Sequence, residues 1–87
     1  MSTKVLTITT SYQDVTTALS LADATTFLFQ NTSAFNDIIL VQTTGGLPAD
    51  STLGFVLSAN QAESFENSTT DIIYMRTNRK EALLAVI

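Results

Sequence analysis

The stretch DIILVQT, residues 37–43, contains four consecutive apolar residues and is the starting point for predicting the fold. The run is far too short for a membrane-spanning helix, which needs about 18 apolar residues. Isoleucine and valine favour an extended chain, and an unbroken apolar run is typical of a strand that is covered on both faces. We therefore predict a central or interface-covered strand over residues 37–43, and we regard it as the best candidate for the core.

Two further strands are predicted before this run. Apolar side chains alternate with other residues over residues 4–9 and 25–31, which is the period-two pattern of a half-buried strand. Asn31-Thr32-Ser33 then supplies turn residues.

Residues 11–24 give a mixed signal between these two strands. Four apolar residues recur at helical spacing, namely Val15, Ala18, Leu19 and Ala22. We expect a short helix or an irregular turn, with Ser11 and Asp14 forming a capping box.

The strongest turn signal follows the central run, in GGLPAD at residues 45–50. Glycine permits positive φ, and Pro48 cannot donate a hydrogen bond to a sheet, so an exposed loop is predicted. Four more strands are predicted with turns between them, over residues 53–58, 63–65, 71–77 and 81–87. We expect the last two strands to form a closing hairpin.

Seven or so short strands with at most one short helix predict an all-β fold, either a small antiparallel β-sandwich or a jelly-roll-like barrel. The 87 residues suit a single domain, residues 1–87. Domains of this size often rely on disulfides, metals or association, and this chain has no Cys and no His. With 45% hydrophobic and only 14% charged residues, part of its surface is expected to face another subunit.

The composition also excludes several kinds of function. A net charge of −4 argues against nucleic acid and anionic membranes as partners. Because His and Cys are absent and the carboxylates are scattered, we predict no catalytic, metal-binding or cofactor-binding residue, and no enzyme activity. No signal-peptide core is visible, so we expect a soluble protein that is made in the cytoplasm. Two glycosylation sequons, at Asn31 and Asn67, are interpreted as chance matches.

Two groups of side chains are candidates for contacts. Arg76, Arg79 and Lys80 gather at one predicted turn, where they could bridge to an acidic partner or keep an edge soluble. Six aromatic residues could form a glycan-binding platform: Tyr12, Phe27, Phe29, Phe55, Phe65 and Tyr74. Such platforms usually expose a row of Trp or Tyr, and Trp is absent here, so we expect these rings to pack in the core.

Four motifs are spread over nearly the whole chain: TTSYQDVT at residues 9–16, FQN at 29–31, GFVL at 54–57 and DIIY at 71–74. In this combination the chain resembles a group of small tailed-bacteriophage virion proteins of similar length. A glycine often precedes the second strand in that group. This chain has Asp23-Ala24 at that point, so we expect the local turn to differ.

The resemblance implies a structural role in the virion, as a decoration or cement protein that binds the major capsid protein or other virion proteins, often as a trimer. The contact elements would be residues 4–9, residues 81–87 and the loop at 45–52, where Leu47 and Pro48 are candidate contact residues. The alternatives are a neck, tail or fibre-base component and a free-standing glycan-binding module. An enzyme would need a composite site shared with another chain.

Overall fold

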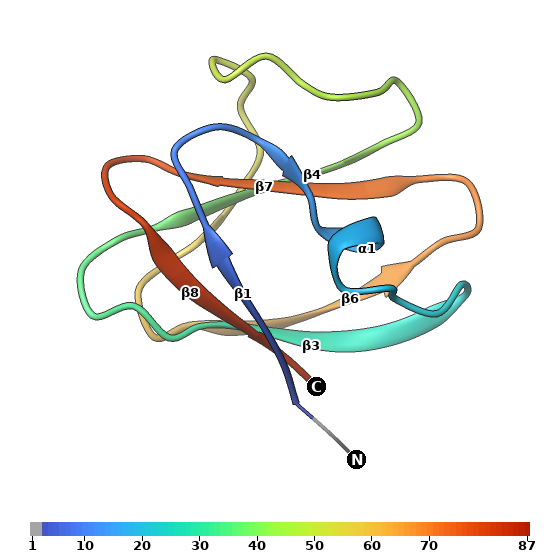
Figure 1. Ribbon diagram of the computed structural model, residues 1–87, viewed down its shortest axis with the longest axis horizontal. Helices are drawn as coiled ribbons and strands as arrows, with labels where there is room; N and C mark the ends of the chain where they lie inside the picture. The colour runs from blue at the N-terminus through green and yellow to red at the C-terminus, as the bar shows by residue number, and fades with distance from the viewer. Residues whose placement is uncertain (1–2) are drawn as a thin grey trace.

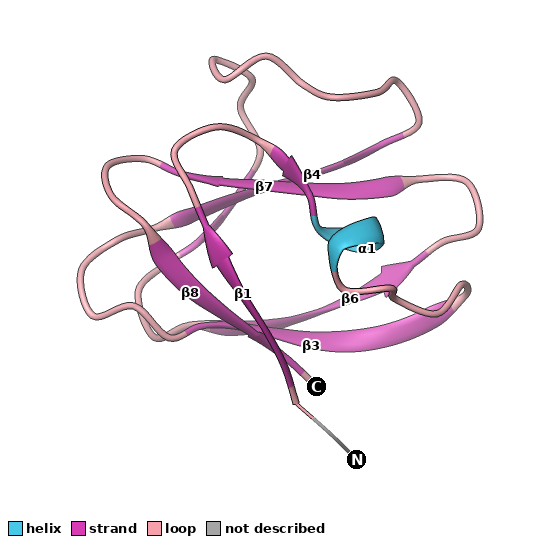
Figure 2. Cartoon of the chain, viewed as in Figure 1, coloured by secondary structure: helices cyan, strands magenta, loops and turns pink. Residues whose placement is uncertain are grey.

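The computed structural model describes residues 3–87, which form eight strands and one short helix. The elements are β1 (Lys4–Ile8), β2 (Gln13–Asp14), α1 (Val15–Ala18), β3 (Thr25–Asn31), β4 (Ile38–Thr43), β5 (Phe55–Leu57), β6 (Ala62–Asn67), β7 (Ile72–Thr77) and β8 (Ala82–Val86) (Figure 1). They build two four-stranded sheets, in the orders β1-β8-β3-β6 and β2-β7-β4-β5. Figure 2 shows the strands in two layers that face each other, so the predicted β-sandwich is confirmed.

The strand pairs follow one simple rule. The chain pairs β1 with β8, β2 with β7, β3 with β6 and β4 with β5, all antiparallel. One long hairpin, with its tip between β4 and β5, would give these pairs if it were rolled up. Two further antiparallel pairs, β3 with β8 and β4 with β7, join the four ladders into two sheets. This is the winding of a double-sheet jelly roll.

The closing hairpin predicted for the last two strands is wrong. β7 lies between β2 and β4 in one sheet, whereas β8 lies between β1 and β3 in the other. The turn at residues 78–81 therefore carries the chain across the sandwich. Turn residues indicate that the chain reverses, but the strand that it pairs with next depends on partners far away in the sequence.

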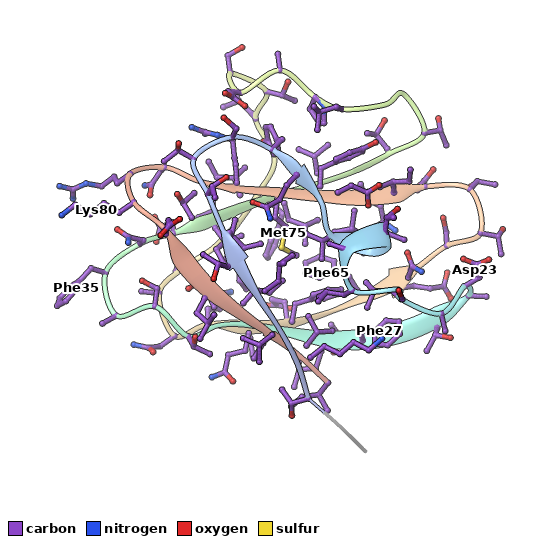
Figure 3. The ribbon with its side chains drawn as sticks, viewed as in Figure 1. Asp23, Phe27, Phe35, Phe65, Met75 and Lys80 are labelled. Carbon is purple, nitrogen blue, oxygen red and sulfur yellow. The ribbon has the colours of Figure 1, made fainter. Side chains whose placement is uncertain are left out.

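The core lies between the two sheets and takes alternate residues from each strand. In β4, Ile38 and Leu40 are buried, while Ile39 and Val41 on the other side are half-buried. The central position predicted for this run is confirmed, because β4 lies between β7 and β5. The core residues are Ile8, Val15, Leu19, Leu21, Phe29, Ile38, Leu40, Leu57, Ile73, Met75, Ala82, Leu84 and Val86. Figure 3 shows Met75 and Phe65 between the two layers.

Strand and helix bounds differ from the prediction at several places. β5 covers only Phe55–Leu57, and Leu53 lies outside it with 92% of its surface exposed. β6 is longer than predicted. The short helix α1 begins after Asp14, whose carboxylate accepts hydrogen bonds from the backbone N and the hydroxyl of Thr17, both at 2.8 Å. The capping box with Ser11 is therefore wrong, because Asp14 itself is the N-cap.

Two buried asparagines fasten the ends of β3 and β6. Asn31 donates from Nδ2 to the carbonyls of Asn36 at 2.7 Å and Leu57 at 3.0 Å. Asn67 donates from Nδ2 to the carbonyls of residues 21–22, at 3.2 and 3.0 Å. Both side chains are fully buried, which places the two sequon asparagines inside the folded protein.

The turn before β3 contains a residue in the left-handed region. Ala24 has φ of +52°, a conformation that glycine adopts at lower cost than alanine. A glycine at position 24 would be unstrained.

Candidate interaction surfaces

The outer side of the β1-β8-β3-β6 sheet carries an apolar patch, named here the bare face and defined as Val5, Leu28, Leu83, Ala85 and Ile87. These residues alternate along their strands with side chains of the core, so they point away from it. The exposed fraction is 53% for Val5, 46% for Leu83, 43% for Ile87 and 37% for Leu28.

The sheet register brings the bare face together from three strands. Val5 is paired with Ala85, and Leu28 exchanges two backbone hydrogen bonds with Ile87, at 3.0 and 2.9 Å. Leu83 and Ile87 lie on either side of Ala85 along β8 and share its face. Polar side chains border the patch on the same side of the sheet, namely Thr7, Thr26, Gln30, Ser64 and Glu66. Two strands of this face, β1 and β8, fall within residues 4–9 and 81–87, whose role as contact elements stays a prediction.

The edges of the two sheets are short, blocked or charged. The Gln13 side chain blocks the edge of β1, because its Nε2 donates to the carbonyl of Thr7 at 3.2 Å and its Oε1 accepts from the N–H of Thr9 at 2.9 Å. The edge strands β2 and β5 have two and three residues, and β6 carries Glu63 and Glu66. Such edges discourage the addition of a strand from another chain. Faces are therefore better suited to contact than edges.

The outer side of the other sheet is covered by the tip loop, residues 44–54, which joins β4 to β5 and passes over β4 and β7 (Figure 1). At Gly54 the loop lies directly against β4, since a Cβ there would be 2.3 Å from the carbonyl oxygen of Leu40 and 2.8 Å from Cγ2 of Val41. Tyr74 lies on this side of β7, outside the main core, and is only 5% exposed. The loop thus covers part of the outer surface of its own sheet, although Val56 on β5 is still 48% exposed there.

Tyr12 and Asp50 anchor the tip loop. The Tyr12 hydroxyl donates a hydrogen bond to the carbonyl of Thr52 at 2.6 Å, and the Tyr12 backbone N–H donates to Oδ1 of Asp50 at 3.2 Å. The hydroxyl of Ser11 donates to Oδ2 of the same carboxylate, also at 3.2 Å. These bonds attach the loop to the segment just before β2.

Arg76 completes this anchor. Its guanidinium lies over the Tyr12 ring, 5.8 Å from the ring centroid, and its Nε donates to the carbonyl of Thr10 at 2.9 Å. Burial raises the pKa of the Tyr12 hydroxyl above its usual value of 10.0; the charge of Arg76 opposes this rise, and that of Asp50 adds to it.

A third candidate surface lies at one end of the sandwich. Arg79 and Lys80, in the β7–β8 connection, line an open hollow of about 330 Å³ together with Phe35 and Asn36 from the β3–β4 connection. The Phe35 side chain is 89% exposed. Figure 3 shows Phe35 and Lys80 at the same end of the molecule, on neighbouring loops.

The predicted contact residues fall in three different places. Arg79 and Lys80 share the hollow, but Arg76 lies on β7 with the tip-loop anchor. Leu47 and Pro48 belong to the tip loop, where Leu47 is 66% exposed and Pro48 is half-buried. Their role as contact residues stays a prediction.

The aromatic residues are mostly buried, as expected. Phe29, Tyr12 and Tyr74 are buried, and Phe27 and Phe65 pack against the core. Phe55 is 43% exposed, with its ring centroid 5.2 Å from that of Phe65.

Phe35 escapes prediction from the sequence. It stands alone among the turn residues NTSAFND, 31–37, where the alternation of the flanking strands has ended. A large apolar side chain in the middle of turn residues is the signal that could have found it.

The described part of the chain contains neither a cluster of metal-ligating side chains nor a helix that could span a membrane. Within residues 3–87, no three acidic side chains lie close enough together to hold a metal ion. The helix in this part of the chain is too short to cross a membrane.

Comparison with models of known protein families, with curated proteins and with solved structures finds no match for this chain.

Proposed function

We propose that this chain is a structural protein of a bacteriophage particle, a decoration protein that binds the capsid and stabilises the head through repeated protein contacts. The bare face is the observation that carries the proposal. An apolar centre with a polar border is the usual arrangement of a protein interface. The motifs shared with small virion proteins direct the proposal to a phage particle, and jelly rolls recur in viral capsid domains, which is an analogy of fold.

The size of the bare face indicates how it would be used. The whole outer side of the sheet, with four strands about 4.8 Å apart and about 17 Å long, has an area of roughly 300 Å² in projection, and the bare face is only part of it. A stable pairwise interface buries about 800 Å² on each partner. One contact through the bare face would thus be weak, and firm attachment would need many copies repeated by symmetry.

Self-association would strengthen such attachment. A trimer would carry three bare faces on one body, so that binding of the first raises the effective concentration of the other two. The closed and charged sheet edges would keep these copies from joining into open fibres.

Purified particles of the phage that encodes this chain provide the first test. Quantitative mass spectrometry is expected to find hundreds of copies in each particle. About a dozen copies would indicate a neck or tail component instead. Absence of the chain from particles would overturn the proposal.

A binding assay tests the role of the bare face. Particles that lack this chain are mixed with purified protein and sedimented, and the bound fraction is measured. The double variant V5S/L83S is expected to bind at least about tenfold more weakly, because it removes the two large apolar side chains of the bare face that are most exposed. Leu53→Ser is the matched control, since Leu53 is 92% exposed but lies in the tip loop. Equal binding by V5S/L83S and the unmodified protein would contradict the role of this face.

A further inference from the structure

The β3–β4 connection, residues 32–37, is held in one shape by its own side chains. Asn31, buried at the end of β3, donates to the carbonyl of Asn36 at 2.7 Å and accepts from the N–H of Ser33 at 3.0 Å. The hydroxyl of Ser33 accepts from the N–H groups of Phe35 and Asn36, at 3.3 and 3.1 Å. Asn36 then reaches the next loop, where its Nδ2 donates to the carbonyl of Glu81 at 3.1 Å. The loop is thus ordered before any partner arrives.

Phe35 is presented to solvent by this ordered loop. With 89% of its surface exposed, the ring contributes little to the core, although burial of a phenylalanine ring is strongly favourable. A partner that buried the ring would gain this energy and would incur little cost in ordering the loop, because the hydrogen bonds around Ser33 already fix it. An exposed aromatic ring on a preordered loop has the properties of a binding anchor.

Two cations stand beside this ring. Arg79 and Lys80 line the hollow with Phe35 and Asn36, in a chain whose net charge is −4. Two carboxylates are close by in the sequence, since Asp37 follows Asn36 and Glu81 follows Lys80. Neither of them lines the hollow. Arg79 and Lys80 are therefore the charged groups closest to a ligand in the hollow, and Coulomb attraction is strongest at the shortest distance.

We propose that this hollow binds an acidic segment of a partner protein, which places a carboxylate beside Arg79 and Lys80 and an apolar side chain against Phe35. Arginine offers a planar fork that suits a carboxylate, and lysine adds a mobile point charge. Nucleic acid fits less well, because two cations neutralise too few phosphates to offset the net charge. The site uses other residues than the bare face and goes beyond the proposed function.

A peptide titration followed by NMR tests the site. The probe is an end-blocked peptide of sequence glycine–glutamate–leucine–glutamate–glycine, and its comparison is the same peptide with glutamine in place of both glutamates. At millimolar peptide, the amide signals of residues 35–36 and 79–80 are expected to shift with the acidic probe and to shift far less with the glutamine peptide. Phe35→Ser is expected to weaken binding about tenfold. R79Q/K80Q is expected to weaken it about fivefold, the range for two exposed ion pairs.

Leu53→Ser is the matched control, because it removes an equally exposed apolar side chain from the tip loop. Its affinity for the acidic probe is expected to equal that of the unmodified protein. Both Phe35 and Leu53 are exposed, so the variants are expected to keep the spectrum of the folded protein.

Three results would overturn the inference. They are the absence of shifts with the acidic probe, equal shifts with the glutamine peptide, and equal shifts with inorganic phosphate, which would mean unspecific anion pairing. None of these bears on the bare face, so the two proposals fail or stand separately.

Discussion

The two outer faces of this sandwich are built from similar strands but meet different surroundings. On the β2-β7-β4-β5 sheet the tip loop lies over the outer side, and Tyr74 is 5% exposed. On the β1-β8-β3-β6 sheet no long connection passes over the described strands, and Val5 and Leu83 are 53% and 46% exposed. The tip loop thus covers part of one apolar face, whereas the other is open along the described strands.

The difference follows from the rolled-hairpin winding. The tip of the hairpin has a long connection, residues 44–54, which can fold back over its own sheet. β1 and β8 pair with each other on the other sheet, and the described connections that join this sheet to the rest of the chain are shorter than the tip loop or lead to the opposite sheet. An exposed apolar patch on a small protein commonly marks a site of interaction. On the covered face, by contrast, the outward-facing Tyr74 is only 5% exposed.

The largest expected effect comes from detaching that cover at Gly54. Gly54→Ala is expected to lower the free energy of unfolding by about 3 kcal/mol, because the new Cβ would meet the Leu40 carbonyl at 2.3 Å and backbone must move. Urea denaturation measures the loss, and limited proteolysis measures the release of the tip loop. Gly45→Ala is the matched control, since its Cβ would stand 3.4 Å from the Thr43 hydroxyl, an ordinary contact. If both variants were equally stable, the loop would not lie against β4.

Removal of the hydroxyl that anchors the loop has a smaller expected effect. Tyr12→Phe deletes the hydrogen bond to the Thr52 carbonyl, which is 2.6 Å long, and is expected to cost about 1 kcal/mol. Faster proteolysis within residues 44–54 should accompany the loss, whereas the bare face should be unchanged. A variant with unaltered stability and unaltered proteolysis would show that this bond does not hold the loop.

The same hydroxyl gives the covered face a dependence on alkaline pH. Burial raises the pKa of Tyr12, and Asp50 adds to the rise against the opposing effect of Arg76, so the folded protein holds this proton more tightly than the unfolded chain does. The contribution of Tyr12 to stability is therefore complete below its usual pKa of 10.0 and is lost as the pH rises above that value through the folded pKa. Urea denaturation of the unmodified protein and Tyr12→Phe at increasing pH measures the difference. A parallel decline in the two proteins would contradict the assignment to Tyr12.

The smallest effect on stability is expected on the bare face. Leu83→Thr is expected to change the free energy of unfolding by less than about 0.5 kcal/mol, because the side chain is already 46% exposed. Val41→Thr on the covered face places a hydroxyl next to Gly54. It is expected to lower the free energy of unfolding by more than Leu83→Thr does. Denaturation of the two variants side by side makes the comparison. A larger loss for Leu83→Thr would mean that the bare face supports the fold and is not kept for a partner.

Much of the fold could be predicted because alternation is a local signal. The pattern over residues 4–9 and 25–31 and the unbroken run at 38–41 placed three strands correctly. The candidate contacts were harder. Arg79 and Lys80 were named as candidates because of their charge, and their role stays a prediction. The exposure of Phe35 was not predicted, because it depends on how Asn31 and Ser33 shape the loop around it. The capping box failed for a similar reason, since Ser11 bonds to Asp50, far away in the sequence.

The amino-acid sequence by itself determined that this chain is an all-β protein, with its strands near the predicted positions and a surplus of apolar surface. Alternation and turn residues act over a few neighbours, so they suffice for these properties. Only the tertiary structure shows which strands pair, that β7 and β8 belong to different sheets, and which apolar face the tip loop covers. These depend on contacts between residues distant in the chain, such as Tyr12 with Thr52 and Gly54 with Leu40, and local pattern does not encode a choice among distant partners.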